Sequence, residues 1–410
     1  MKLRVRAHTS HPNALARGDI IFCMSAHDAA ALLGGLPPRR FLAQHWQKTP
    51  LLIRGALPGF TGVLTPAQLL RLACRDDAQS RLVIRNARHW EAHEGPFQRS
   101  LFRGLPARGW SVLVHEVDRF LPEARALLER FSFLPYARLD DLMVSYAVPG
   151  GGVGPHYDSY DVFLLQGQGR RRWRVSRQLD AALVADAPLK LLRHFRPQQE
   201  WVLEPGDMLY LPPGWAHDGV ALDPCTTYSI GFRAPAWQEL GIHFLRFLED
   251  RLELEGLYQD PGLKPQDSPA RIARTMVREV ARRLDNIRWS GSDIARFLGQ
   301  YLTEPRAHIF FTPPLPQLPL AAFATRARRR GVDLELRSQM LYFGDLFFIN
   351  GETVQVKGRA CESLRHMADT RGLPAVDTTQ RGLVALLHQW YGSGYLSLSA
   401  RPRASRRRKP

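Results

Sequence analysis

The stretch that most constrains the fold lies between Leu142 and Phe232, where short apolar segments are separated by glycine and proline. The segments are LMVSYAV, VFLLQG, RRWRV, EWVLEPGDMLYLPPG and TTYSIGF. Most alternate between residues suited to the two faces of a strand, and turn residues end each of them. Several short strands punctuated in this way predict a β-sandwich or a barrel.

Helical patterns flank this β-rich part. Before it, TPAQLLRLACRD has a threonine cap and an apolar stripe at helical spacing, and WSVLVHEVDRFLPEARALLERF is a strand that runs into a helix. After it we expect helices in residues 236–258, 270–287 and 292–304, followed by a mixed part that contains the hairpin QMLYFGDLFFINGETVQV. A chain of 410 residues exceeds one ordinary core. We therefore predict an α+β protein in three parts: a barrel, a helical segment and a small α+β end.

Composition excludes several classes of protein. With 45% hydrophobic and 23% charged residues, the chain is typical of a soluble globular protein, and no run approaches the roughly 18 apolar residues of a membrane span. The four cysteines form no CxxC pair, so reduced thiols are expected. These features predict a cytoplasmic protein without membrane contact.

The formal net charge of +17 is concentrated at the two ends. The tail RPRASRRRKP holds six positive charges, and residues 1–20 hold a net three. Basic ends of this kind attract RNA electrostatically or are simply solvated, and both interpretations stay open.

A candidate metal site combines His156, Asp158 and His217. Residues i and i+2 of a strand point to the same side, so His156 and Asp158 are able to face one point inside a barrel. His217 follows an EPGD turn, an apolar strand and a rigid PPG turn. Two histidines and one carboxylate on one face of a metal leave its other positions open, as in non-haem Fe(II) oxygenases.

Chance weakens the His-x-Asp motif when it is taken alone. With 14 histidines and 39 acidic residues in 410, about one His-x-acid triplet is expected at random, and the chain also contains His89-Trp90-Glu91. The glycine-rich entry PGGGVGPH and the strands on both sides favour the metal site. Ordinary polar loop residues remain the alternative.

Strand parity singles out one arginine of GRRRWRV. Trp173 and Val175 share a face with Arg171, whereas the neighbouring arginines share the other face. If Trp173 faces the core, Arg171 is an inward guanidinium that needs an anion, and the carboxylate of a small co-substrate would bind it bidentately. A plain basic surface strand is the alternative. The same parity places Ser145 of DDLMVSYAV as a hydroxyl donor beside that carboxylate.

These residues resemble a known family. The stretches DDLMVSYAVPGGGVGPHYDSYDVFLLQGQGRRRWRV, LEPGDMLYLPPGWAHDGVAL and YSIGFRAP closely resemble the bacterial JmjC-type (cupin-like) ribosomal oxygenases, which are 2-oxoglutarate-dependent ribosomal protein arginine hydroxylases. FLAQHWQKTPLLIRG and SGYLSL fit the same family, so the likeness covers roughly residues 36–400 and is densest over 138–236.

The resemblance implies a domain order and a set of binding residues. We expect an N-terminal extension (1–35), a double-stranded β-helix JmjC domain (36–236), a helical dimerisation segment (237–312), a winged-helix-like domain (313–400) and a basic tail (401–410). The resemblance further implies His156, Asp158 and His217 as Fe(II) ligands, with Arg171 and Ser145 holding the distal carboxylate of 2-oxoglutarate.

The resemblance also implies a pocket for the substrate arginine, formed here by Asp141, Met143, Tyr160 and Ser229. Asp141 supplies a counter-charge for a guanidinium, and Met143 and Tyr160 are suited to clamp its apolar stem. Barrel packing by Met143 and Tyr160, and a plain strand hydroxyl at Ser229, remain the alternatives.

The resemblance implies that the protein hydroxylates the β-carbon of an arginine and uses Fe(II), 2-oxoglutarate and O2 to do so. The expected target is large-subunit ribosomal protein number sixteen. A homodimer and a contact of the basic tail with ribosomal RNA are also expected. Hydroxylation of a histidyl residue or lysine demethylation on the same fold are alternatives, because Asp141 does not separate arginine from lysine. A non-catalytic ribosome- or RNA-binding protein and a zinc hydrolase are further alternatives, both disfavoured by Arg171.

Overall fold

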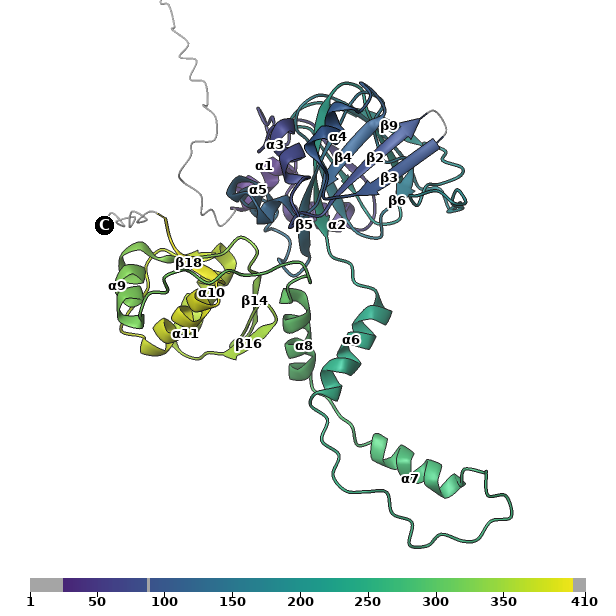
Figure 1. The fold of residues 1–410 in the computed structure, drawn as a ribbon, viewed down its shortest axis with the longest axis vertical. Coiled ribbons are helices and arrows are strands. Elements are labelled where there is room, and N and C mark those ends of the chain that lie inside the picture. Colours follow the sequence, from purple (N-terminus) through teal and green to yellow (C-terminus); the bar gives the residue numbers. More distant parts are fainter. Residues whose placement is uncertain (1–24, 87–88, 401–410) are drawn as a thin grey trace, which may run out of the picture.

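The computed structural model describes residues 25–86 and 89–400. Figure 1 shows a β-rich first domain, a smaller C-terminal domain beside it, and an arm that carries α6 and α7 away from both. The predicted basic tail and residues 1–24 lie outside the described residues. No helix in the part of the chain described here is long and apolar enough to cross a membrane.

Two antiparallel sheets build the first domain. The larger has the strand order β1-β10-β7-β12-β5-β4-β2-β3 and the smaller has the order β6-β11-β8-β9. The strands are β1 (Leu51–Ile53), β2 (Ser80–Asn86), β3 (His89–Glu94), β4 (Trp110–Val114), β5 (Leu139–Ala147), β6 (His156–Tyr157), β7 (Val162–Gln166), β8 (Arg171–Ser176), β9 (Gln199–Leu203), β10 (Met208–Leu211), β11 (Ala216–Ala221) and β12 (Cys225–Phe232).

The last eight of these strands pair in a nested order. β5 pairs with β12, β6 with β11, β7 with β10 and β8 with β9, as if one long hairpin were folded over on itself. This pairing is the jelly-roll or double-stranded β-helix topology. The barrel predicted from the short strands is therefore confirmed.

The central strands β7 and β10 of the larger sheet are buried on both faces. Toward the helices, β7 and β10 contribute Phe163 and Tyr210 to the main core, where Tyr210 packs edge-on against Phe41 at 4.9 Å. Toward the barrel interior, the same strands contribute Leu164 and Leu209 to a second cluster with Trp173. Burial on both faces explains why VFLLQ is a continuous apolar run and not an alternating one.

Short helices cover the outer face of the larger sheet. They are α1 (Ala26–Leu32), α2 (Pro38–Gln44), α3 (Pro66–Leu72), α4 (Arg99–Arg103), the 3-10 turn η1 (Val117–Arg119) and α5 (Pro122–Glu129). Thr65 caps α3 in a capping box with Gln68, as the sequence predicts.

The boundary expected for the N-terminal extension is wrong for residues 25–35. Ser25 caps α1 through a capping box with Asp28, and Leu32 and Leu33 are buried in the core of the first domain. The prediction failed because a helix of seven residues, about two turns, has a weak periodic signal, and its burial depends on the sheet it covers.

The chain after β12 forms the arm and the C-terminal domain. Its helices are α6 (Trp237–Glu249), α7 (Arg274–Leu284), α8 (Gly291–Thr303), α9 (Leu320–Arg330), α10 (Arg359–Thr370) and α11 (Arg381–Gly392). Its strands are β13 (Val332–Leu334), β14 (Met340–Phe343), β15 (Leu346–Ile349), β16 (Glu352–Gln355), β17 (Gly372–Leu373) and β18 (Leu396–Leu398). The hairpin predicted in residues 339–356 therefore has three strands, β14-β15-β16.

One expected helix end and one expected domain boundary differ in the structure. The helix expected over 236–258 ends at Glu249, because Phe244 and Phe247 pack against Phe297 of α8 and residues 251–270 are all exposed. α8 packs against the β14-β15-β16 sheet, where Gly299 touches the ring of Phe348 so closely that a Cβ would lie 2.3 Å from it. The domain boundary expected between residues 312 and 313 therefore assigns α8 to one part of the chain and the sheet that it covers to another.

One glycine of β11 makes room for the largest side chain of the barrel interior. A Cβ on Gly219 would lie 2.6 Å from the ring of Trp173, which pairs opposite it on β8. We expect Gly219→Ala to lower the free energy of unfolding by about 1–3 kcal/mol, because the ring has to leave its rotamer.

Chemical denaturation measures this change. Gly241→Ala is the matched control, since a Cβ there meets nothing within 4 Å and α6 gains helix propensity. Equal stability of Gly219→Ala and the wild type would contradict the packing described.

Candidate functional site

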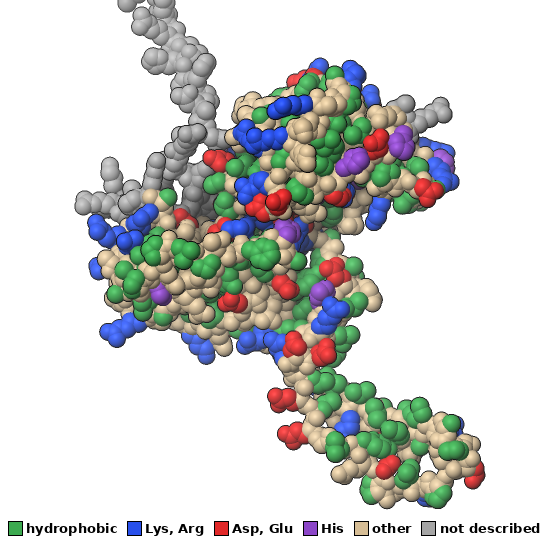
Figure 2. Space-filling view, in the orientation of Figure 1, with side chains coloured by type: hydrophobic (Ala, Val, Ile, Leu, Met, Phe, Trp, Pro, Cys, Tyr) green, Lys and Arg blue, Asp and Glu red, His purple; other side chains and the backbone are tan. Residues whose placement is uncertain are grey.

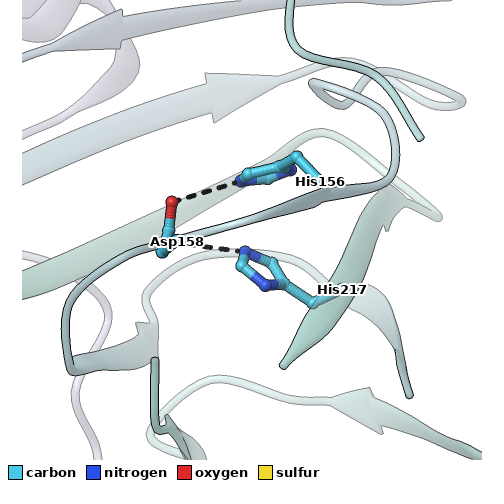
Figure 3. Close-up of side chains that lie close together, drawn as sticks. All are labelled: His156, Asp158 and His217. Carbon is cyan, nitrogen blue, oxygen red and sulfur yellow. Dashed lines mark ion pairs between the residues drawn. The ribbon is translucent and has the colours of Figure 1, made fainter. Parts of the chain in front are cut away.

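Three side chains converge inside the barrel from two paired strands. His156 lies on β6 directly opposite His217 on β11, and Asp158 follows β6 by one residue. The Nε2 atom of His156 lies 3.7 Å from Oδ1 of Asp158, and Nε2 of His217 lies 3.5 Å from Oδ2 of the same carboxylate (Figure 3). The strand pairing thus brings together the triplet that the sequence singles out.

Backbone carbonyl groups fix the orientation of both imidazole rings. Nδ1 of His156 lies 2.8 Å from the carbonyl oxygen of Gly154, and Nδ1 of His217 lies 3.0 Å from that of Trp215. A carbonyl oxygen only accepts, so in each ring Nδ1 carries the proton and donates it. Each Nε2 is left with a free lone pair directed at the shared point, which is how metal-binding histidines are held.

The environment keeps His217 uncharged. Burial, together with the neighbouring His156 ring 4.2 Å away, lowers the pKa of His217 to about 4. A neutral imidazole is the form that binds a metal ion.

The donor set fits a divalent transition metal. One possible ligand atom of each of the three residues lies within 4.8 Å of the other two. Among the described residues, no other group of three or more His, Cys, Asp or Glu side chains brings its ligand atoms so close together. Two imidazole nitrogens and a carboxylate oxygen form the facial triad of non-haem Fe(II) sites, which leaves open positions on the metal.

A buried guanidinium faces the same interior. Arg171 is 5% exposed and pairs with Ala221 of β11. Along β11, Ala221 lies two residues after Gly219, the partner of Trp173, and four residues after His217. Residues at even spacing share a face, so Arg171 points to the same side as His217. The strand parity predicted from GRRRWRV is confirmed.

Arg171 has no carboxylate partner among the described residues. Its Nη1 atom donates to the hydroxyl of Ser145 at 3.2 Å, and its Nε has no hydrogen-bond partner. A buried cation with one neutral hydrogen-bond partner is costly unless an anion binds it, so the surroundings of Arg171 are suited to a carboxylate.

Two further polar side chains, Thr227 and Gln166, lie near Ser145 of β5. Thr227 of β12 is paired with Ser145 in the register of the two strands. The Thr227 hydroxyl donates to the side chain of Gln166 at 3.2 Å. Sequence reasoning missed Thr227, although TTYSIGF carries the signal: Thr227 and Ser229 share one face of that strand.

The four residues expected to bind the substrate lie on β5, on β12 and in the turn after Asp158. Asp141 and Met143 are on the face of β5 that also carries Ser145, and Ser229 is the register partner of Met143 on β12. Tyr160 lies in the turn after Asp158 and is 40% exposed. Asp141 and Tyr160 lie close to one another, since both come within 4.0 Å of the position that a Cβ on Gly231 would take.

Negative charge gathers around Asp141 and Tyr160. Burial by itself raises the pKa of Asp141, but the hydrogen bond and charge of His115, the amide of Glu116 and the charge of Arg306 outweigh it and hold the pKa below its usual value. Burial and the charges of Asp158, Asp141 and Asp140 raise the pKa of Tyr160. At neutral pH these two side chains are therefore an ionised carboxylate and a neutral phenol.

The residues behind Asp141 were missed by sequence reasoning. Nδ1 of His115 lies 3.6 Å from Oδ2 of Asp141, and the amide of Glu116 donates to the same oxygen at 3.1 Å. Both belong to the turn after β4, far from β5 in sequence, so no spacing rule connects them to Asp141.

Comparison with known proteins gives a consistent result. Residues 126–240 match the JmjC domain family, and residues 286–397 match the ROXA-like winged helix family, which places α8 with the C-terminal domain. The ribosomal protein uL16 3-hydroxylase of Escherichia coli is 35% identical over 77% of this chain and 84% of its own length. A probable ribosomal oxygenase of Haemophilus influenzae is 38% identical over 63% of this chain and 62% of its own length.

Solved structures agree with these matches. The crystal structure of E. coli YcfD superposes with a TM-score of 0.79 at 32% identity and covers 88% of this chain and 98% of that one. The structure of the ribosomal oxygenase YcfD with cobalt and 2-oxoglutarate superposes with a TM-score of 0.76 over the same shares.

The geometry of the three ligands predicts a measurable metal response. When the free cobalt(II) concentration is about 100 times the Kd, binding at one site stabilises the folded protein by about 2.7 kcal/mol. This stabilisation raises the Tm by several degrees. We expect this shift in the wild type and its loss in His217→Ala, measured by differential scanning fluorimetry.

His89→Ala is the control, because it removes an exposed histidine of the chance triplet His89-Trp90-Glu91. An undiminished shift in His217→Ala would exclude the proposed ligand set.

Proposed function

Since the chain belongs to the JmjC-domain ribosomal oxygenases, we propose that it hydroxylates the β-carbon (C3) of an arginine in ribosomal protein uL16. The observation that carries the proposal is the arrangement of charge around the metal ligands. The barrel that holds the three metal ligands also holds a buried cation, Arg171, and a buried anion, Asp141. Arg171 suits an anionic co-substrate, and Asp141 suits a cationic target side chain.

The roles of the residues follow from their positions. His156, Asp158 and His217 would hold Fe(II), which together with 2-oxoglutarate supplies the activation of O2 and the transfer of one oxygen atom, with succinate and CO2 as products. Arg171 and Ser145 would bind the distal carboxylate of 2-oxoglutarate and thereby fix its orientation.

The pocket residues would position the target. Asp141 would pair its carboxylate with the cationic end of the target side chain, while its Oδ2 atom accepts from the amide of Glu116. Met143 and Tyr160 would pack on the apolar stem, and Ser229 would supply a hydroxyl. The fixed negative charge favours an arginine or a lysine over a neutral histidine.

Mass spectrometry tests the proposal. The protein is incubated with Fe(II), 2-oxoglutarate and uL16 of E. coli, and we expect one oxygen atom added to one arginine. Addition to a histidine, or loss of a methyl group from lysine, would point to the alternative activities. Turnover that survives in His156→Ala would refute the oxygenase mechanism.

Arg171→Gln separates co-substrate binding from metal binding. Removal of one partner of a buried charge pair costs about 2–5 kcal/mol, so KM for 2-oxoglutarate should rise at least about 30-fold. The cobalt response should stay unchanged. Arg172→Gln, on the outer face of the same strand, is the matched control. Equal weakening of metal and 2-oxoglutarate binding by Arg171→Gln would contradict the assignment.

We infer a homodimer from the arm. Four side chains on one face of α7 are between 41% and 57% exposed, and no residue of α7 is buried in the single chain. This α7 stripe consists of Met276, Val277, Val280 and Leu284. Hydrophobic side chains gather over the arm in Figure 2, and an exposed stripe of this kind is typical of an interface.

We expect Val280→Asp to dissociate the dimer by placing a charge in this stripe, whereas Thr275→Asp, on the opposite face of α7, leaves it intact. Light scattering coupled to size-exclusion chromatography at micromolar concentration gives the mass of each variant. A wild-type protein that is monomeric, or an unchanged dimer in Val280→Asp, would refute the interface.

A further inference from the structure

A cluster of charged residues lies directly behind Asp141 and joins distant parts of the chain. We name it the Glu116 cluster; its members are Glu116, Arg119, Asp140, Arg306 and His308. Glu116 precedes the turn η1, Arg119 is its last residue, Asp140 lies on β5, and Arg306 and His308 lie in the connection between α8 and α9.

Glu116 is the centre of this cluster. It is 3% exposed, and its carboxylate lies 3.2 Å from Nη1 of Arg119, 2.6 Å from Nη1 of Arg306 and 2.8 Å from Nε2 of His308. A buried carboxylate is tolerated only when cations compensate it, so these partners keep Glu116 in place.

The backbone of Glu116 transmits this constraint to the pocket. Its φ of 56° lies in the left-handed region, which is uncommon for a glutamate and persists when the surroundings fix it. In this conformation the Glu116 amide donates to Oδ2 of Asp141 at 3.1 Å. The orientation of the Asp141 carboxylate therefore depends on the orientation of residue 116.

Arg306 bridges two members of the cluster at once. Its Nη1 pairs with Glu116 at 2.6 Å, and its Nη2 donates to Oδ1 of Asp140 at 2.7 Å. Although burial lowers the pKa of Arg306, the charges of Asp140, Glu116 and Asp141 raise it above the usual value. A planar guanidinium is able to hold both carboxylates in fixed relative positions, whereas a lysine ammonium is a single point of charge.

We propose that Arg306 is a positioning residue for substrate binding: by bridging Glu116 and Asp140 it fixes residue 116, and residue 116 aims the Asp141 carboxylate at the cationic substrate side chain. This inference rests on the proposed role of Asp141. It assigns a part in substrate recognition to the connection between α8 and α9, outside the JmjC domain itself.

Other contacts already join the catalytic domain to the C-terminal part, so docking alone does not require Arg306. Nη1 of Arg233 donates to the carbonyl of Leu302 at 2.6 Å, and Nε of Arg371 lies 3.4 Å from Glu129. A purely structural role of Arg306 would affect stability without a selective effect on substrate binding.

The test uses Arg306→Lys in the full-length protein, because this change keeps the charge beside Asp141 and removes the bridge. The probe is fluorescently labelled uL16 of E. coli, whose Kd is measured by anisotropy, and initial rates give KM and kcat. We expect Kd and KM for uL16 to rise about tenfold, with KM for 2-oxoglutarate and uncoupled 2-oxoglutarate turnover unchanged. Arg75→Lys is the matched control, since Arg75 forms an exposed bidentate pair with Asp77.

A double-mutant cycle with Asp141→Asn decides whether Arg306 acts through Asp141. Asp141→Asn alone should weaken uL16 binding, and Arg306→Lys should then weaken it no further, because the group to be positioned no longer carries its charge. Unchanged Kd in Arg306→Lys, or effects of the two changes that add in full, would overturn the inference. An Asp141→Asn variant that binds uL16 like the wild type would refute the proposed pocket instead.

Discussion

The register of β11 between its two neighbours is the constraint on which the site depends. β11 pairs with β6 on one side, which sets His217 opposite His156, and with β8 on the other, which sets Ala221 opposite Arg171. Because side chains alternate along a strand, a shift by one residue would turn either His217 or Arg171 out of the barrel. One set of backbone hydrogen bonds thus fixes the metal ligands and the buried cation together.

The interior that this register creates is divided by polarity. Leucines and Trp173 fill one part, and the polar part holds Arg171 with Ser145 as well as Asp141. A buried cation and an ionised carboxylate in the same barrel as the triad are suited to orient two different ligands relative to one centre. The helices outside contribute to this order indirectly, since they bury the outer face of the larger sheet and hold its strands in register.

Much of the site was predictable because strand parity is a local rule. The inward face of Arg171 and the common face of Asp141, Met143 and Ser145 follow from alternation, and the structure places them so. His156 and Asp158 share a side for the same reason, but their motif occurs by chance in a chain of this length, so only the resemblance made it specific. The residues behind Asp141 were out of reach, since η1, β5 and the connection after α8 meet only in the folded chain.

The sequence by itself determined most strands of the first domain, the turns between them, the capped helix α3 and the faces on which Arg171 and Ser145 lie, because these depend on neighbours within a few residues. It did not predict β11, the strand that carries His217. Tertiary structure decided which strands pair in the nested order and that α1 belongs to the core. It also decided that α8 packs on the C-terminal sheet and that Arg306 reaches Glu116. Each of these contacts joins segments far apart in the chain, and its free energy comes from burial and charge compensation that exist only once the segments meet.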